Sequence, residues 1–346
     1  MDDNLCLPVS QKLYCNNPDY FCVFKPKIHR DAHLSDNAIL QCQMDIFGPR
    51  HMGKSTACIN TRIGNYVSLV YPHCLRERLP VVAYLAEAGF ILDDVKEALS
   101  SRVQSNHISL FPSAWSKHKQ LVSCQERIEI VLSKTFKDIL AMDASLGKIL
   151  LCQLNDWKHN QDWQPPEGQY TNLGQYLLHR YHDAACSCLV ALGRFAGGST
   201  LSERDEALVG PTCRPLYSLF ILTNDYFSWD KERKRHVASQ GRNTLTNAVG
   251  LYMQWHSLSC RNAKAALRAT MGELQDEYLA LKSALFTPEA ASAISDSARA
   301  WVDTLETIVA GNWLWSMSCP RYKPVRRNPY RALMKQKSKS SQIDCL

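Results

Sequence analysis

Long stretches with apolar residues at spacings of three and four dominate this sequence and restrict it to a helical fold. One stretch places Leu251, Trp255 and Leu258 on one side, as in a helix face packed against a core. Alternating strand-like runs joined by Asn-Gly or Asp-Gly turns are absent. Glycine and proline, at 15 residues each, cluster between these stretches, and breaks are expected at positions such as Pro211 and Pro288. The pattern predicts an all-helical domain of about ten or more helices, with periodic stretches at 80–100, 120–142, 171–194, 212–236, 245–284 and 290–318.

The formal net charge of +7 is concentrated at the C-terminus. Residues 321–346 contain eight basic residues and one acidic residue, so the other 320 residues have no net charge. A protein that binds nucleic acid through its folded body should carry the basic excess there, so nucleic acid is not an expected partner. The segment after Tyr322 is basic and broken by prolines. We therefore interpret 1–322 as one folded domain and 323–346 as a basic tail or the start of an interdomain linker.

The sequence favours a cytoplasmic protein. Its N-terminus lacks the basic and apolar regions of a signal peptide. No apolar run reaches 18 residues, so no membrane span is expected. The 14 cysteines include no C-x-x-C pair, which favours reduced thiols over a zinc site or a disulfide framework.

A short segment matches the phosphate-loop pattern of nucleotide-binding proteins. Residues 48–55, Gly-Pro-Arg-His-Met-Gly-Lys-Ser, satisfy G-x-x-x-x-G-K-S. The motif functions between a buried strand and a helix of a parallel sheet, and no alternation of strands and helices surrounds it. We interpret it as a loop between the first helices.

Three acidic residues form the first cluster that suggests a metal site. Asp93 and Glu97 lie one turn apart on a helix, with Asp94 beside them. Carboxylates this close repel each other unless a cation bridges them, and their hard oxygens suit Mg²⁺. An apolar helix leads into the cluster, which places it at the rim of an apolar space.

A second cluster lies within Asn-Asp-Tyr-Phe-Ser-Trp-Asp-Lys-Glu. Asn224, Ser228 and Glu232 are spaced i, i+4 and i+8, so their oxygens line one helix face over two turns. Such a weakly charged, all-oxygen set suits Mg²⁺ that takes its other ligands from diphosphate and water.

With these motifs the sequence resembles the class I terpene cyclases. Residues 93–97 resemble the aspartate-rich motif in its D-D-x-x-E form, and 224–232 resemble the second metal motif, with Lys231 before the glutamate. Residues 180–184 resemble the R-x-x-D-x segment, in which Arg180 would be the diphosphate sensor, Asp183 the linker and Ala184 the effector. The effector is often glycine in relatives. Arg321 and Tyr322 resemble the C-terminal pair that binds diphosphate.

The closer resemblance is to the cyclase domains of fungal bifunctional enzymes of the fusicoccadiene synthase type, over most of residues 20–322. Many of those proteins join a cyclase domain, through a linker, to a prenyltransferase domain that makes the substrate. The resemblance leaves open a covalently linked prenyltransferase domain and a homo-oligomer as partners.

The resemblance implies a single-domain α-helical class I terpenoid synthase bundle with a central apolar active-site cavity. Magnesium ions, three in number, would hold the diphosphate of a linear isoprenoid at its mouth, and Asp93, Asp94, Glu97, Asn224, Ser228 and Glu232 would be the metal ligands. Arg180, Lys231, Arg321 and Tyr322 would donate hydrogen bonds to diphosphate. An allylic cation would then react in a pocket whose aromatic faces stabilise it. The candidate pocket residues by helical phase are Tyr66, Phe90, Phe220, Trp313 and Trp315.

The expected reaction is Mg²⁺-dependent ionisation and cyclisation of geranylgeranyl diphosphate (C20) to a polycyclic terpene with release of diphosphate. A sesterterpene (C25) cyclase and an isoprenyl diphosphate synthase are the alternatives. The latter uses two aspartate-rich motifs, whereas the second motif here is Asn/Ser/Glu. A non-catalytic helical interaction module leaves four diphosphate-type motifs in the expected order unexplained.

Overall fold

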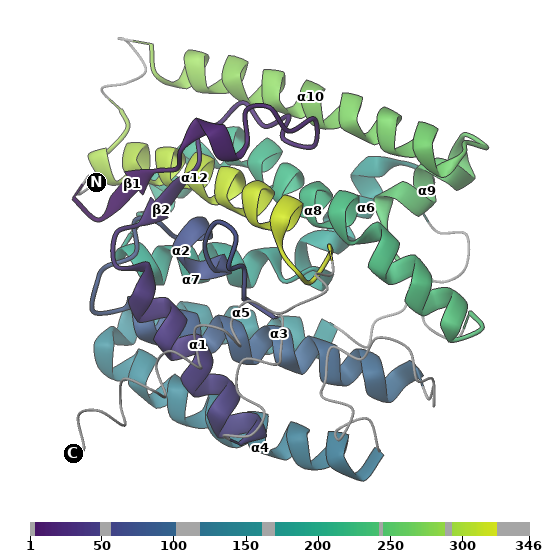
Figure 1. The fold of residues 1–346 in the computed structure, drawn as a ribbon. Helices are drawn as coiled ribbons and strands as arrows, with labels where there is room; N and C mark the ends of the chain where they lie inside the picture. Colours follow the sequence, from purple (N-terminus) through teal and green to yellow (C-terminus); the bar gives the residue numbers. More distant parts are fainter. Residues whose placement is uncertain are drawn as a thin grey trace.

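The described part of the chain is almost entirely helical (Figure 1). The computed structural model describes residues 4–48, 57–101, 118–160, 170–241, 245–287 and 293–323. The all-α prediction is confirmed. The helices are α1 (Ala32–Phe47), α2 (Tyr66–Val70), α3 (Leu79–Ser101), α4 (His118–Met142), α5 (Ala144–Asn160), α6 (Leu173–Asp183), α7 (Cys186–Gly197), α8 (Glu203–Ala238), α9 (Ala248–Trp255), α10 (Cys260–Leu285) and α12 (Asp296–Ser318).

A short two-stranded sheet precedes the helices, and the sequence pattern did not predict it. Strands β1 (Cys6–Pro8) and β2 (Lys27–His29) pair antiparallel, with Cys6 opposite His29. The segment between them contains one 3₁₀ turn, η1 (Gln11–Leu13). It packs on the later helices, where the Val23 amide donates to Gln275 of α10 (2.7 Å). The folded unit therefore begins well before residue 20.

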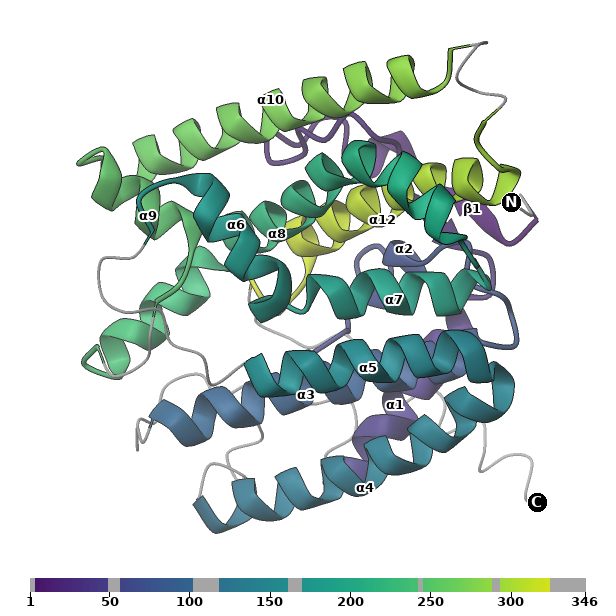
Figure 2. The same cartoon turned by 180° about the vertical axis from the view of Figure 1, so that it is seen from behind.

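Helix α12 forms the centre of the molecule. Every residue from 307 to 322 is buried, so this helix is covered on all sides. Helices α8 and α2 pack against it, α10 packs against α8, and α3 packs against α1 and α4 (Figures 1 and 2). A helix that is apolar all round belongs in a core, which explains the continuous apolar pattern near the C-terminus.

Local side-chain caps set many of the helix starts. The Asn172, Ser202, Asn247, Ser259 and Ser295 side chains each accept a hydrogen bond from a backbone amide two or three residues later. Such a bond satisfies one of the amides that have no partner in the first turn. These starts are encoded within a few residues of sequence.

One predicted break was wrong, and two helix breaks were not predicted. Helix α8 continues through Pro211 and Pro215, because its long buried face offsets the hydrogen bonds that the prolines remove. The stretch 171–194 divides between α6 and α7, where Ala185 has a φ of 56°. The stretch 245–284 divides between α9 and α10 beside Ser257, which has a φ of 51°. Periodicity did not reveal either left-handed residue, because apolar spacing continues across both breaks.

Two sequence features lie outside the described residues. They are the phosphate-loop pattern, apart from Gly48, and the basic tail after Lys323. Across the described ranges, no helix combines the length and apolar character needed to cross a membrane. No disulfide joins the described cysteines.

Candidate active site

Arg321 joins the C-terminal end of α12 to the acidic end of α3. It lies in the turn after α12, and its guanidinium donates to Asp94 Oδ2 (2.6 Å) and to Asp93 Oδ2 (3.0 Å). Asp94 is buried, whereas the Asp93 side chain is partly exposed. Two of the predicted motifs, 227 residues apart in the chain, are therefore in direct contact. Glu97 lies in α3, but its side chain is outside the described part.

Helix α8 presents its predicted metal ligands beside this contact. The Asn224 side chain donates from Nδ2 to the Tyr322 hydroxyl (2.8 Å), which leaves Oδ1 as the oxygen for a metal. The Ser228 hydroxyl is buried and has no hydrogen-bond partner among the described residues. Glu232 accepts a hydrogen bond from Asn247 Nδ2 (3.0 Å). The i, i+4, i+8 spacing thus places the three ligands on the face of α8 that points toward the Arg321–Tyr322 turn.

Three cations surround one carboxylate where α3 and α8 meet. Besides Arg321, Lys231 Nζ and an Arg235 guanidinium nitrogen each lie 3.5 Å from Asp94 Oδ1. Burial by itself would raise the pKa of Asp94, but Arg321, Lys231 and Arg235 lower it to about 2. The pKa of Lys231 is lowered, first by burial and then by the Arg321 charge. Because the three positive charges exceed the two negative charges of Asp93 and Asp94, the arrangement favours binding of an anion.

Arg180 belongs to a second buried network beside the first. It donates to Asp183 and, at 3.0 Å, to Asp225 Oδ1. The fully buried Asp225 also accepts hydrogen bonds from the Tyr176 hydroxyl and the Ala248 amide (3.0 Å). The network ties α6 to α8 and α9. It holds the Arg180 guanidinium at the end of α6, beside the break between α6 and α7.

Ala184, the predicted effector position, lies at that break. It follows the last residue of α6, and its backbone amide donates to the Arg180 carbonyl (2.9 Å). The next residue, Ala185, adopts the left-handed conformation before α7 begins. A glycine at 185 would adopt the same backbone without the strain of a side chain.

The donor set fits Mg²⁺ shared with a phosphate ligand. It consists of oxygens from carboxylate, amide and hydroxyl groups, and the Ser228 hydroxyl has no other described partner. Burial and the nearby Asp225 raise the pKa of Glu232, so a cation that keeps this carboxylate ionised is favoured there. Across the described side chains, no three His, Cys, Asp or Glu residues form a metal site by themselves. A bound ion would therefore need oxygens from Asn224, Ser228 and the phosphate ligand.

Three of the five predicted pocket aromatics pack together beside the charged site. The Tyr66 ring contacts Phe90 and Trp315, each with ring centres 5.0 Å apart, and Trp315 also contacts Tyr322. The Arg321 guanidinium lies over the Phe90 ring, 5.1 Å from its centre. This aromatic cluster, defined as Tyr66, Phe90, Trp315 and Tyr322, forms an apolar wall next to the three cations.

The other two predicted pocket residues lie elsewhere. Trp313 packs on Phe21 (4.4 Å between ring centres) and donates to the Asp19 carbonyl, beneath the N-terminal segment. Residues two apart on a helix point in nearly opposite directions, so Trp313 and Trp315 face opposite sides of α12. Phe220 lines a small apolar cavity between α7, α8 and α12, together with residues such as Leu189 and Ile308. This cavity lies one turn before Asn224 along α8.

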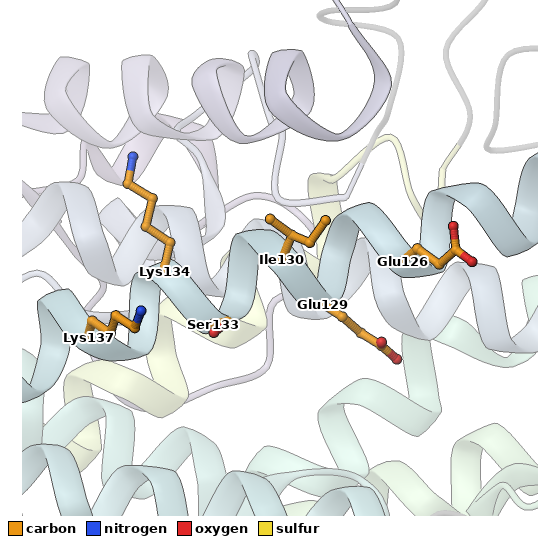
Figure 3. Close-up of a pocket in the computed structure, with 6 residues that line it drawn as sticks. All are labelled: Glu126, Glu129, Ile130, Ser133, Lys134 and Lys137. Atoms are coloured by element: carbon orange, nitrogen blue, oxygen red, sulfur yellow. The ribbon is translucent and has the colours of Figure 1, made fainter.

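One surface hollow is unrelated to this site. Among the described residues only α4 lines it, so it is an open face of one helix (Figure 3). Its two acidic side chains lie toward one end and its two basic side chains toward the other (Figure 3). Its lining residues are Glu126, Glu129, Ile130, Ser133, Lys134 and Lys137.

Four residues of the charged site were absent from the sequence prediction. Asp225, Tyr176 and Asn247 form the network behind the ligands, and Arg235 is the third cation on Asp94. Arg235 could have been found from the sequence, because it lies one helical turn after Lys231. Asp225 follows Asn224 on α8 and Tyr176 lies one turn before Arg180 on α6, but their contact with each other and with Asn247, which caps α9, depends on helix packing.

Comparison with known proteins agrees with this geometry. Residues 84–277, more than half of the chain, match the family described as "Terpene synthase family 2, C-terminal metal binding". The chain belongs to this family. The matched region includes the acidic end of α3 and the whole of α8, the two helices that contribute the candidate metal ligands.

Curated relatives of this terpene synthase come from fungi. It is 33% identical over 331 residues to a conidiogenone synthase of Penicillium roqueforti (strain FM164), covering 93% of this chain and 44% of the relative. It is 32% identical to a cyclopiane-type diterpene synthase of Penicillium chrysogenum, covering 95% of this chain and 43% of the relative. A bifunctional sesterterpene synthase, astC of Talaromyces wortmannii, is 26% identical, with 86% and 40% covered. The chain thus spans less than half the length of these relatives.

Solved structures share the fold. Aristolochene synthase from Penicillium roqueforti superposes with a TM-score of 0.61 at 20% identity, covering 84% of this chain and 96% of that one. A cucumene synthase variant superposes with a TM-score of 0.63 at 11% identity, covering 88% and 100%. The terpene synthase fold predicted from the motifs is therefore confirmed.

Proposed function

We propose that this chain is a class I terpene cyclase domain that ionises and cyclises geranylgeranyl diphosphate and releases diphosphate. The observation that carries the proposal is the meeting of Arg321, Lys231 and Arg235 at Asp94, with an aromatic wall beside them. Such a site pairs an anion-binding end with an apolar end, as a substrate with a diphosphate head and a hydrocarbon tail requires. The C20 substrate is supported by relatives named diterpene synthases.

The proposed ionisation breaks the bond between C1 of the substrate and the diphosphate oxygen, and the bonding electrons leave with diphosphate. Mg²⁺, when bound, supplies Lewis-acid stabilisation of that leaving group. We assign Asp93, Asp94, Glu97, Asn224, Ser228 and Glu232 as the residues that would hold Mg²⁺, with three ions as the proposed number.

Basic residues would bind the diphosphate group directly. Arg321, Lys231 and Arg235 would donate hydrogen bonds to diphosphate oxygens beside the Asp94 carboxylate. Tyr322 donates from its hydroxyl, and Arg180 binds diphosphate from the end of α6. Asp183 links Arg180 to the effector position, Ala184. Because each donor is already held by buried contacts, little reorganisation is needed when charge develops on the leaving group.

Aromatic rings stabilise the resulting allylic cation. The faces of Tyr66, Phe90 and Trp315 lie next to the site, and a cation over such a ring gains about 0.5–2 kcal/mol. Phe220 bounds the apolar space farther along α8. These side chains also exclude water, which would otherwise capture the cation.

The test is incubation with C10, C15, C20 and C25 diphosphates and Mg²⁺, with mass spectrometry of the organic extract. We expect cyclic products from the C20 substrate and loss of Mg²⁺-dependent diphosphate release in Asn224→Ala. Asp230→Ala is the matched control, because this side chain is on the same helix but 66% exposed. An Asn224→Ala variant with full activity would contradict the site assignment.

One alternative has specific support. A relative named as a bifunctional sesterterpene synthase favours testing C25 turnover alongside C20. Adding isopentenyl diphosphate to an allylic diphosphate tests for an isoprenyl diphosphate synthase, because only that activity consumes the isopentenyl unit. We further propose that 1–322 is the cyclase domain and that 323–346 leads toward a linked prenyltransferase domain.

A further inference from the structure

Glu87 is a fully buried carboxylate that the proposed chemistry does not use. It lies on α3 two helical turns before Asp94, and none of its surface reaches solvent. Its Oε1 accepts from Gln43 Nε2 of α1 (2.7 Å), and its Oε2 accepts from the backbone amide of Cys58 (2.8 Å). Both of these donors are neutral, and no ion pair joins Glu87 to another described residue.

The environment of Glu87 opposes its ionisation. Burial raises the pKa of Glu87 to about 7, and the hydrogen bonds from Cys58 and Gln43 only partly reverse this effect. The Asp94 carboxylate raises it further, and the buried thiols of Cys42 and Cys58 are the other ionisable groups nearby. An apolar side chain would fill this space without the cost of burying a carboxylate. Packing alone therefore does not account for a carboxyl group at this position.

What Glu87 holds is the segment 57–60, which positions two rings of the aromatic cluster. Glu87 binds the backbone amide of Cys58, and the carbonyl of the same residue accepts two further hydrogen bonds. Their donors are Trp315 Nε1 (3.1 Å) and the Tyr66 amide (2.9 Å). A second link joins Asn60 Nδ2 to Ser318 Oγ (2.8 Å) at the end of α12. Movement of Cys58 would therefore displace both Tyr66 and Trp315.

These contacts form one continuous path from α3 to the pocket wall. We propose that Glu87 is a positioning residue that orients Tyr66 and Trp315 through Cys58 and so determines which product the cyclisation favours. The inference rests on the proposed function, because it concerns the product of that same site. Cation–π stabilisation depends on where the ring lies, so a small ring displacement changes which cationic intermediate is favoured.

Two variants test the path. Glu87→Gln retains the size but places an amide donor against the Gln43 donor, so one of the two amides must rotate. The double variant Gln43→Glu/Glu87→Gln exchanges the two side chains and restores both contacts. The new amide at position 87 would accept from the Cys58 backbone amide and donate to the new carboxylate at position 43. We expect the ratio of major to minor products from geranylgeranyl diphosphate to fall about threefold or more in Glu87→Gln, and to recover in the double variant.

A second readout does not depend on activity. Trp315 fluorescence is isolated by subtracting the spectrum of each protein's Trp315→Phe counterpart, and we expect its emission maximum to shift in Glu87→Gln and to return in the double variant. Should Glu87→Gln not fold, Gln43→Met removes one donor and should shift both readouts in the same direction. Leu267→Ala, a buried change on α10, is the control for general destabilisation.

The outcomes separate cleanly. An unchanged product ratio and Trp315 emission in Glu87→Gln would overturn the inference, as would failure of the double variant to restore them or an equal product shift in Leu267→Ala. If the wild-type protein makes no terpene while Trp315 emission follows the expected pattern, the proposed function fails and the positioning role of Glu87 stands.

Discussion

Gly311 is the residue at which α12 and α2 approach most closely, and replacing it tests the packing behind the active site. A Cβ atom at this position would lie 1.9 Å from the Leu69 carbonyl oxygen, 2.5 Å from its carbon and 2.9 Å from Val70 Cα. The clashing atoms belong to the backbone of α2, which cannot rotate away as a side chain can. Reaching even 3.0 Å requires α2 and α12 to separate by at least about 1.1 Å.

The expected effect of Gly311→Ala follows from two opposing contributions. Replacing glycine by alanine within a helix stabilises it by about 1 kcal/mol. Overpacking a core costs about 1–3 kcal/mol and sometimes more, and a backbone clash belongs at the upper end. We therefore expect the free energy of unfolding to fall by about 2 kcal/mol, which lowers Tm by roughly 3 °C in a chain of this length. Because Tyr66 begins α2, the product ratio should also change.

Urea denaturation and product analysis measure these effects, with Gly272→Ala as the matched control. Gly272 lies within α10, and a Cβ atom there would meet nothing within 4 Å. That variant should be unchanged or more stable by up to about 1 kcal/mol. The reasoning would be refuted if Gly311→Ala were as stable as the wild-type protein with the same products.

Three further predictions concern charged residues. Arg235→Ala should raise KM for the isoprenoid diphosphate roughly tenfold by removing one cation from Asp94, whereas Arg233→Ala, an exposed neighbour, should leave it unchanged. Arg180→Lys should lower kcat/KM in a diphosphate-release assay by about tenfold or more, because lysine lacks the fork that reaches both Asp183 and Asp225. For Glu87, the folded pKa of about 7 exceeds the unfolded value, so its contribution to stability is present at low pH and is lost as pH rises through 7. Between roughly pH 5 and 8 that loss is about 2 kcal/mol, and urea titrations of Glu87→Gln should lack it.

The face of α8 that carries the candidate metal ligands was predictable because its geometry is local. Asn224, Ser228 and Glu232 share one side of any regular helix, whatever surrounds it. The same reasoning placed Trp313 and Trp315 in one pocket, although residues two apart on a helix diverge. It also ended a helix at Pro211, where the packed face of α8 offsets the lost hydrogen bond.

Partners of the site residues were not predictable in the same way. The contact of Arg321 with Asp94 spans 227 positions, and that of Asp225 with Tyr176 spans 49. Both depend on how the helices pack. Glu87 appeared in the sequence only as a charge that interrupts an apolar run, and its two hydrogen-bond donors come from α1 and the segment before α2.

The sequence by itself determined the helical class, and it indicated the candidate site residues and the helix face on which each lies, because periodicity and capping act within a few residues. Tertiary structure decided which of those residues meet. It brought three cations to one buried carboxylate. It also let Tyr66 and Trp315 donate hydrogen bonds to the same backbone carbonyl, that of Cys58, whereas Trp313 packs on the other side of α12. The physical reason is that charge pairing and ring packing act only over a few ångströms, a distance that packing sets between residues far apart in the chain.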